Sequence, residues 1–190
     1  NPTGMPDAEA SAQAEEYLQK CIENQDSAGG VVSCKVHGMP AGIGEPVFDK
    51  LDACLGQAVM SIGAVKAFAV GDGCEVSKKN GSTNNDAFCN VNGQISKKTN
   101  HAGGILGGIS DGSDIILRAY FKPTPSIYQK QQTVNQAGEE IEIQIKGRHD
   151  PIVVSRAVVV VEAMTAVTIL DELLRNMTSR LDGIKKFYHK

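Results

Sequence analysis

The residues of this sequence that could most readily do chemistry together are Arg148, His149 and Asp150, with Gly147 before them and Pro151 after them. A guanidinium presents a planar set of donors that suits a phosphate or a carboxylate, and a neighbouring carboxylate can accept a proton. Glycine lets a backbone approach a ligand, and proline restricts the chain as it leaves the loop. The alternative is a surface ion pair near the start of a helix, which composition alone favours.

A second candidate is the run Lys122-Pro123-Thr124-Pro125-Ser126, which directly follows a predicted strand. An ammonium group, hydroxyl groups and backbone amides could together hold a phosphate there. An ordinary proline turn after a strand explains the same residues. Taken alone, the run favours the turn.

Paired glycines stand at positions 103–104 and 107–108. Their spacing matches neither the dinucleotide-binding pattern nor the P-loop, so close backbone packing is about as good an explanation as a nucleotide loop. Residues 108–112 match the letters of the G-x-S-x-G nucleophile elbow, but a strand is predicted after them where that motif needs a helix. We therefore reject a serine nucleophile. His101 could contact a ligand, although a hydrogen-bonded loop histidine is the commoner case.

Composition limits the class of protein. The chain has 190 residues, of which 41% are hydrophobic, enough for a single domain over residues 1–190. A net charge of −3 without a basic tract argues against nucleic acid as a partner. The most apolar stretch, residues 151–170, contains Arg156 and Glu162 and so argues against a membrane span. The five cysteines lack a C-x-x-C pair, which predicts no metal site and reduced thiols of a cytoplasmic protein.

Local patterns predict an alternation of helices and strands. Asp7 should cap a surface helix over residues 8–24, and an amphipathic helix is expected over residues 47–62. The helix expected over 156–177 is apolar on every side in its first half, so it should be buried all round, although its valine run could also form a strand. Strands are predicted at 31–36, 64–70, 114–121 and 141–145, the last with one wet face. Residues 71–100 should form a long mobile loop, and 175–190 a polar tail.

Several longer motifs occur together, in one order, and resemble the chorismate synthase family. They read PAGIGEPVFDKLDA at 40–53, MSIGAVK at 60–66, NHAGGILGGIS at 100–110, FKPTPSI at 121–127 and GRHDP at 147–151, with EAM at 162–164. These motifs are long and specific, and the resemblance covers nearly all of the chain. It corresponds to the C-terminal half of the family's chain. The absence of an initiator methionine likewise suggests part of a longer polypeptide.

The resemblance implies an α+β fold, a β-α-β sandwich with helices between antiparallel sheets, and a homotetramer. It implies a cytoplasmic lyase that eliminates phosphate from 5-enolpyruvylshikimate 3-phosphate to give chorismate, in the shikimate pathway of aromatic amino acid biosynthesis. The cofactor would be reduced FMN. NADP is a further nucleotide associated with the family, and it stays open whether the flavin is reduced by the enzyme itself or by an external reductase.

The resemblance also implies roles for individual residues. Arg148 would contact both flavin and substrate. Asp150 would lie beside the reacting centre, bind substrate and assist proton removal, so these two residues are the catalytic candidates. Lys122 would meet the flavin phosphate or ring oxygens. The flavin contacts implied are Gly63, Ala64, Gly107, Lys122, Pro123, Thr124, Pro125, Ser126 and Arg148.

Two substitutions and one larger absence depart from the family pattern. Ser126 stands where threonine is frequent, which keeps the hydroxyl, and Ile152 replaces a smaller residue. The family's two catalytic histidines, several substrate arginines and a further flavin segment belong to its N-terminal part and have no match here. We therefore expect this chain alone to be inactive. The alternative function is a non-catalytic flavin- or phosphate-binding module of the same fold.

Overall fold

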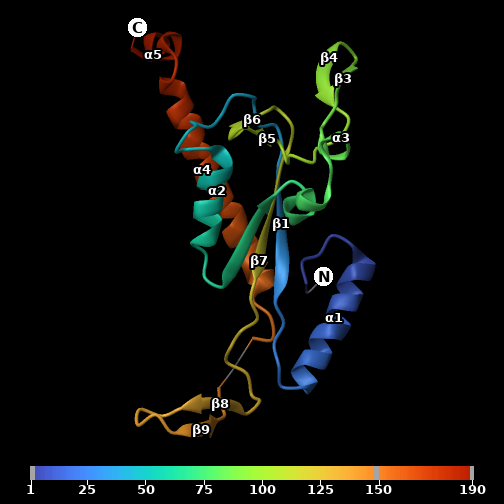
Figure 1. Ribbon diagram of the computed structural model, residues 1–190, viewed down its shortest axis with the longest axis vertical. Coiled ribbons are helices and arrows are strands. Elements are labelled where there is room, and N and C mark those ends of the chain that lie inside the picture. The colour runs from blue at the N-terminus through green and yellow to red at the C-terminus, as the bar shows by residue number, and fades with distance from the viewer. Residues whose placement is uncertain (1–2, 148–149, 189–190) are drawn as a thin grey trace.

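A three-stranded antiparallel sheet forms the centre of the molecule in a computed structural model that describes residues 3–147 and 150–188 (Figure 1). Its strands are β1 (Gly30–Val36), β7 (Ile115–Phe121) and β2 (Val65–Val70), in the order β1-β7-β2. Gly30 lies opposite Phe121 and Val36 opposite Ile115, so β1 and β7 pair along their whole length. Helices combined with antiparallel sheets confirm the predicted α+β class.

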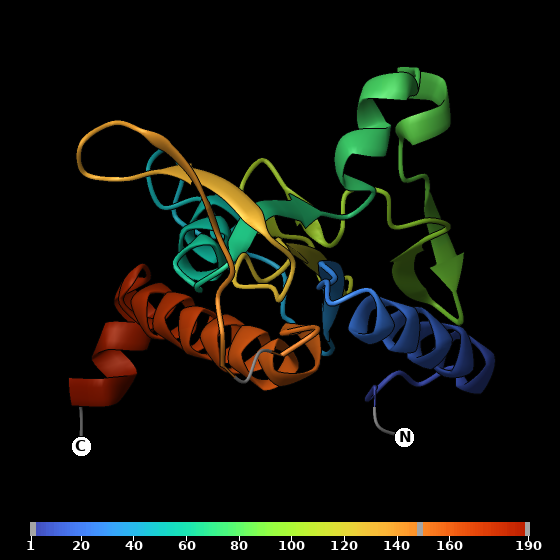
Figure 2. The same ribbon diagram turned by 90° about the horizontal axis from the view of Figure 1, so that it is seen from below.

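One face of this sheet carries the core because β7 alternates. Ile115, Leu117, Ala119 and Phe121 are buried, whereas the residues between them are partly exposed on the other face. Two helices cover the buried face, α2 (Leu51–Met60) and α4 (Val154–Thr178). Figures 1 and 2 show both helices on the same side of the sheet.

Helical spacing decides which residues of α2 and α4 reach the core. Leu51, Leu55 and Val59 recur every fourth residue and are fully buried. The buried residues of α4 recur every third or fourth residue; they are Ala157, Val161, Thr165, Ile169 and Glu172. The expected all-round burial of α4 is wrong for this chain, since Val159 is 64% exposed. The alternative of a valine strand is wrong too, because the whole run is helical.

The first helix, α1 (Ala8–Glu23), begins where the sequence predicts. The Asp7 carboxylate accepts a hydrogen bond from the amide of Ala10 at 2.8 Å, which satisfies one free amide of the first turn. Only Ser11 and Cys21 of α1 are buried, which confirms a surface helix. Helix α2 begins later than predicted because Glu45 and Asp49 exchange backbone hydrogen bonds in a tight turn just before it.

Residues 71–100 contain regular structure, so the expected irregular loop is wrong, whereas its mobility stays a prediction. They form a 3-10 helix η1 (Gly73–Lys78), helix α3 (Gly81–Asn84) and a hairpin of β3 (Phe88–Val91) and β4 (Gln94–Lys97). Figure 1 shows this arm projecting from one end of the sheet. A small hairpin of β5 (Ile105–Leu106) and β6 (Ile109–Ser110) follows.

A second hairpin projects from the opposite end of the sheet (Figure 1). It pairs β8 (Gln131–Val134) with β9 (Glu140–Ile143). Every residue of β9 is exposed, so the expectation of one wet and one buried face is wrong within this chain. The expected polar tail is wrong in part, because residues Leu181–Tyr188 form helix α5.

Candidate functional site

Two of the predicted cofactor segments lie side by side where β2 begins and β7 ends. The amide of Lys122 donates a hydrogen bond to the carbonyl of Ala64 at 2.9 Å, and Val65 pairs with Phe121. Ala64 has a φ of 71°, which turns the chain between the end of α2 and the start of β2. No atom lies within 4 Å of the position that a Cβ on Gly63 would take, so this backbone faces open space. The structure therefore brings Gly63, Ala64 and Lys122 together.

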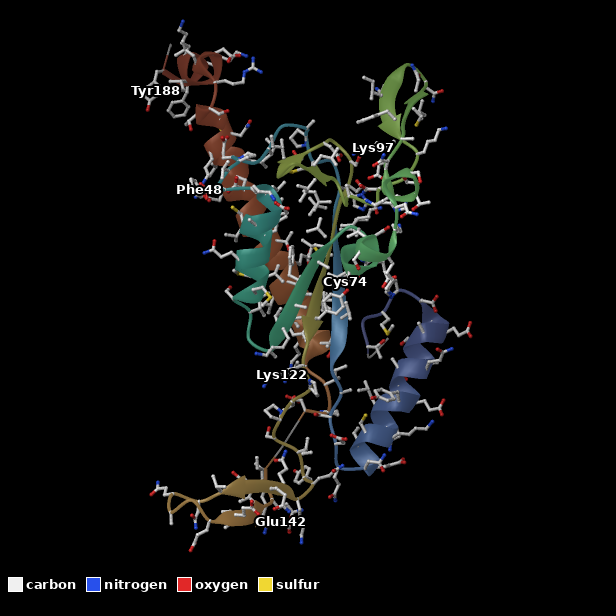
Figure 3. The ribbon with its side chains drawn as sticks, in the orientation of Figure 1. Phe48, Cys74, Lys97, Lys122, Glu142 and Tyr188 are labelled. Atoms are coloured by element: carbon white, nitrogen blue, oxygen red, sulfur yellow. The ribbon has the colours of Figure 1, made fainter. Side chains whose placement is uncertain are left out.

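The run from Lys122 to Ser126 leaves polar groups available for a ligand. The Lys122 side chain is exposed and forms no salt bridge within residues 3–147 and 150–188; Figure 3 shows it below the sheet, near the second hairpin. The Thr124 hydroxyl is buried and has no hydrogen-bond partner in the described part of the chain. A buried hydroxyl without a hydrogen-bond partner destabilises the protein unless a further molecule forms a hydrogen bond with it. An ammonium and a free hydroxyl thus stand two residues apart.

Asp150 lies near the same end of the molecule. It lines a small cavity of about 90 Å³ together with Ser126, Ser27 and Pro151. Its carboxylate forms an ion pair with Arg156 in the first turn of α4. The predicted catalytic residue Arg148 and its neighbour His149 lie outside the described residues.

Gly107 does not join this cluster. It stands in the turn between β5 and β6, and the next carbonyl, that of Gly108, accepts a hydrogen bond from the amide of Leu51 at the start of α2. Lys122 follows the last residue of β7, and Ala64 stands between the end of α2 and the start of β2, so both lie at the other end of these elements. Seven residues of strand separate the two ends, which corresponds to roughly 20 Å. Within one copy, Gly107 therefore lies far from Gly63, Ala64 and Lys122.

Polar side chains, most of which the sequence did not single out, fix the arm at 71–100. The Asp72 carboxylate is 2.6 Å from His101 Nδ1 and also pairs with Lys79. Lys79 and then His101 lower the pKa of Asp72, against an opposing effect of desolvation. His101 is therefore a hydrogen-bonded loop residue, as the commoner case predicts.

Two further acidic residues, Asp111 and Asp86, also fix the arm. Burial, the largest single effect, would raise the pKa of Asp111, but the ion pair with Lys97 and the hydrogen bonds from Ser113 together lower the pKa. Asp86 accepts backbone hydrogen bonds from His101 at 2.7 Å and Ala102 at 3.0 Å. In the sequence, the only indication of a role for these two acids is their position in polar segments.

Ser110, the serine of the rejected nucleophile motif, is a structural residue. Its hydroxyl donates to the carbonyl of Pro40 at 2.6 Å and accepts the amide of Ile43 at 2.9 Å, and the residue is buried in β6. No histidine contacts it in the described structure. The rejection of the motif is confirmed.

Comparison with known proteins places this geometry in a family. The family model for chorismate synthase matches residues 1–174. The chain belongs to the chorismate synthase family. It is 62% identical to chorismate synthase of Lachnoclostridium phytofermentans and 58% identical to that of Agathobacter rectalis, in both cases over 100% of this chain and 52% of the relative. A crystal structure of chorismate synthase superposes with a TM-score of 0.75 at 27% identity, over 96% of this chain and 48% of that one.

The chain thus spans about half the length of the curated relatives that it matches, which agrees with the C-terminal half of a chorismate synthase. The family implies a flavin, and the residues at the end of the sheet fit one. Among residues 3–147 and 150–188, Lys122 has no ion-pair partner and the Thr124 hydroxyl no hydrogen-bond partner, and the backbone at Gly63 is open. Within residues 3–147 and 150–188, no helix has the length and apolar character of a membrane span.

Proposed function

We propose that this chain is the C-terminal half of a chorismate synthase, which converts 5-enolpyruvylshikimate 3-phosphate to chorismate with reduced FMN. The observation that supports this most is the convergence of Gly63, Ala64 and Lys122, together with the unpartnered hydroxyl of Thr124. Segments from two distant parts of the sequence thereby form one wall that offers donors to an anionic ligand. The completed enzyme would be a phosphate-eliminating lyase.

Each residue of this wall has a separate task in the proposal. Lys122 would hold the flavin phosphate or a ring oxygen through its ammonium group, since no carboxylate in the described structure competes for it. Thr124 would donate its hydroxyl hydrogen to the same ligand, and Pro123 and Pro125 would keep the run extended between them. Ser126 would contribute its hydroxyl beside Asp150, with which it shares a cavity.

Asp150 and Arg148 are the proposed catalytic pair. Arg148 would bind the anionic groups of substrate and flavin through its planar guanidinium. Asp150 would assist proton removal, and Arg156 in the first turn of α4 would hold its carboxylate in place through their ion pair. When bound, reduced FMN supplies transient electron density for the departure of phosphate. The remaining substrate contacts would come from the N-terminal half.

Gly107 requires a separate account, because it lies at the other end of α2 and β7 from Lys122. If it touches a flavin, that flavin would belong to another copy of the chain. The homotetramer proposed for the family supplies such copies. A cytoplasmic location belongs to the same proposal, as does a flavin reduced either by the enzyme with NADPH or by an external reductase.

The test uses a full-length enzyme, made by joining this chain to the N-terminal half of the Lachnoclostridium phytofermentans relative. Under anaerobic conditions with reduced FMN and 5-enolpyruvylshikimate 3-phosphate, this full-length enzyme should form chorismate, measured by absorbance and chromatography. No product above the protein-free control would refute the proposal. FMN binding without product would favour the alternative, a non-catalytic flavin-binding module.

A further inference from the structure

The turn that precedes β1 contacts both segments of the proposed site. The Ser27 hydroxyl donates a hydrogen bond to the carbonyl of Thr124 at 2.7 Å, across 97 residues of sequence. The amide of the next residue, Ala28, donates to the carbonyl of Pro151 at 2.7 Å. Pro151 directly follows Asp150, so one turn holds the cofactor run on one side and the proposed catalytic segment on the other.

Close packing reinforces these two hydrogen bonds. A Cβ on Gly29 would lie 2.6 Å from the carbonyl oxygen of Phe121 and 3.2 Å from Cδ of Pro123. The backbone of the turn therefore lies directly against the beginning of the cofactor run. Any side chain at Gly29 would push that run away from the sheet.

The run itself is stiff, so a single hydrogen bond can orient several of its groups. Pro123 and Pro125 each fix their own φ, and Pro125 restricts Thr124 to extended conformations. Holding the Thr124 carbonyl therefore also fixes the backbone that carries the Thr124 hydroxyl and the chain on either side. We propose, resting on the proposed function, that Ser27 is a positioning residue for flavin binding. It acts through Thr124 and does not touch the flavin itself.

The experiment compares three substitutions in the full-length enzyme. Ser27→Ala removes the hydroxyl, and Ser27→Thr retains it. Ser77→Ala is the matched control, because the Ser77 hydroxyl makes a similar bond to the carbonyl of Cys74 at 2.8 Å in η1, away from the site. For each protein, the Kd for FMN is measured by quenching of flavin fluorescence, alongside kcat, KM and the unfolding temperature.

A hydrogen bond worth about 1 kcal/mol corresponds to roughly a fivefold change in Kd. We expect Ser27→Ala to raise the Kd for FMN about fivefold, while Ser27→Thr and Ser77→Ala stay within about twofold of the unsubstituted enzyme. The unfolding temperatures of Ser27→Ala and Ser77→Ala should be similar. A purely structural role would lower stability without this selective loss of FMN.

The inference is overturned if Ser27→Ala leaves the Kd unchanged, if Ser27→Thr fails to restore it, or if Ser77→Ala weakens FMN binding equally. Failure of the proposed function gives a different result. An unsubstituted enzyme that binds FMN but makes no chorismate would refute the catalytic proposal, and the Kd values would still decide the role of Ser27. An unsubstituted enzyme that does not bind FMN would refute both.

Discussion

Replacing Lys97 by methionine should detach the arm at residues 71–100, because its ion pair with Asp111 is the most buried one in the described structure. The side chains of Lys97 and Asp111 are 4% and 9% exposed. The pair joins the end of β4 to the segment that follows β6 (Figure 3 labels Lys97). In the variant, the Asp111 carboxylate keeps the amide of Ser113 at 2.8 Å but loses its cation. Breaking one side of a buried pair costs about 3–5 kcal/mol.

The loss of stability caused by Lys97→Met should depend on pH, and the titration of Asp111 determines the direction of that dependence. In the native chain the pKa of Asp111 is lowered, so its contribution to stability is present above its ordinary value and is lost as pH falls through the lowered pKa. Without Lys97, only the hydrogen bonds from Ser113 oppose burial, so the pKa of Asp111 should rise from its lowered value. The destabilisation caused by Lys97→Met should therefore be largest near neutral pH and shrink in acid, once Asp111 is protonated in both proteins.

The hairpin of the arm buries little apolar surface, which limits what global unfolding can report. None of the residues in β3 and β4 is buried, and Ile95 is 84% exposed. If opening the arm costs less free energy than unfolding the whole molecule, the arm will open while the core stays folded. Hydrogen exchange at the amides of residues 88–97 is thus the primary assay, with urea unfolding as the second. Exchange should accelerate strongly in Lys97→Met and much less when Asp111→Asn is added. Unchanged exchange in the single variant, or an equal effect in both, would refute the reasoning.

Three further outcomes are expected. In the full-length enzyme, Arg148→Ala should lower kcat/KM about tenfold to a hundredfold, since a charge-assisted contact is worth about 1.5–3 kcal/mol; unchanged kinetics would remove Arg148 from the site. Limited proteolysis should cut first at the turn between β3 and β4, at Asn92 and Gly93, and earlier cleavage in η1 would show that the Asp72 contacts are weak. The 190-residue chain alone should form no chorismate with reduced FMN and substrate, because groups that act as a unit fail together.

Much of the sheet was predictable because its signals are local. The strands at 31–36, 64–70 and 114–121 combine β-branched residues with bounding polar or glycine residues, and the structure contains all three. Asp7 marks the first helix through its own side-chain hydrogen bond, a contact that spans only three residues. Signals of this kind can be recognised without knowledge of the tertiary packing.

The arm and the geometry of the site depend on contacts that no local pattern encodes. The strands β3 and β4 are only four residues long, and Asp72, Asp86 and Asp111 hold the arm against residues distant in sequence. Family motifs named the candidate site residues, but only the structure separates Gly107 from Lys122. The contact between Ser27 and Thr124 involves a backbone carbonyl, so the identity of Thr124 carries no sign of it.

The valine run of α4 explains how a correct pattern led to a wrong expectation. Ala157 and Val161 pack against the sheet, yet Val158, Val159 and Val160 are 44%, 64% and 42% exposed. A helix that is apolar on all sides is stable when it is covered on all sides, and the described part of this chain covers one side of α4. The relatives are about twice as long, and the fold implied by the resemblance places helices between two sheets, of which this chain supplies one. We infer that the hydrophobic pattern reports the burial of α4 in the whole enzyme.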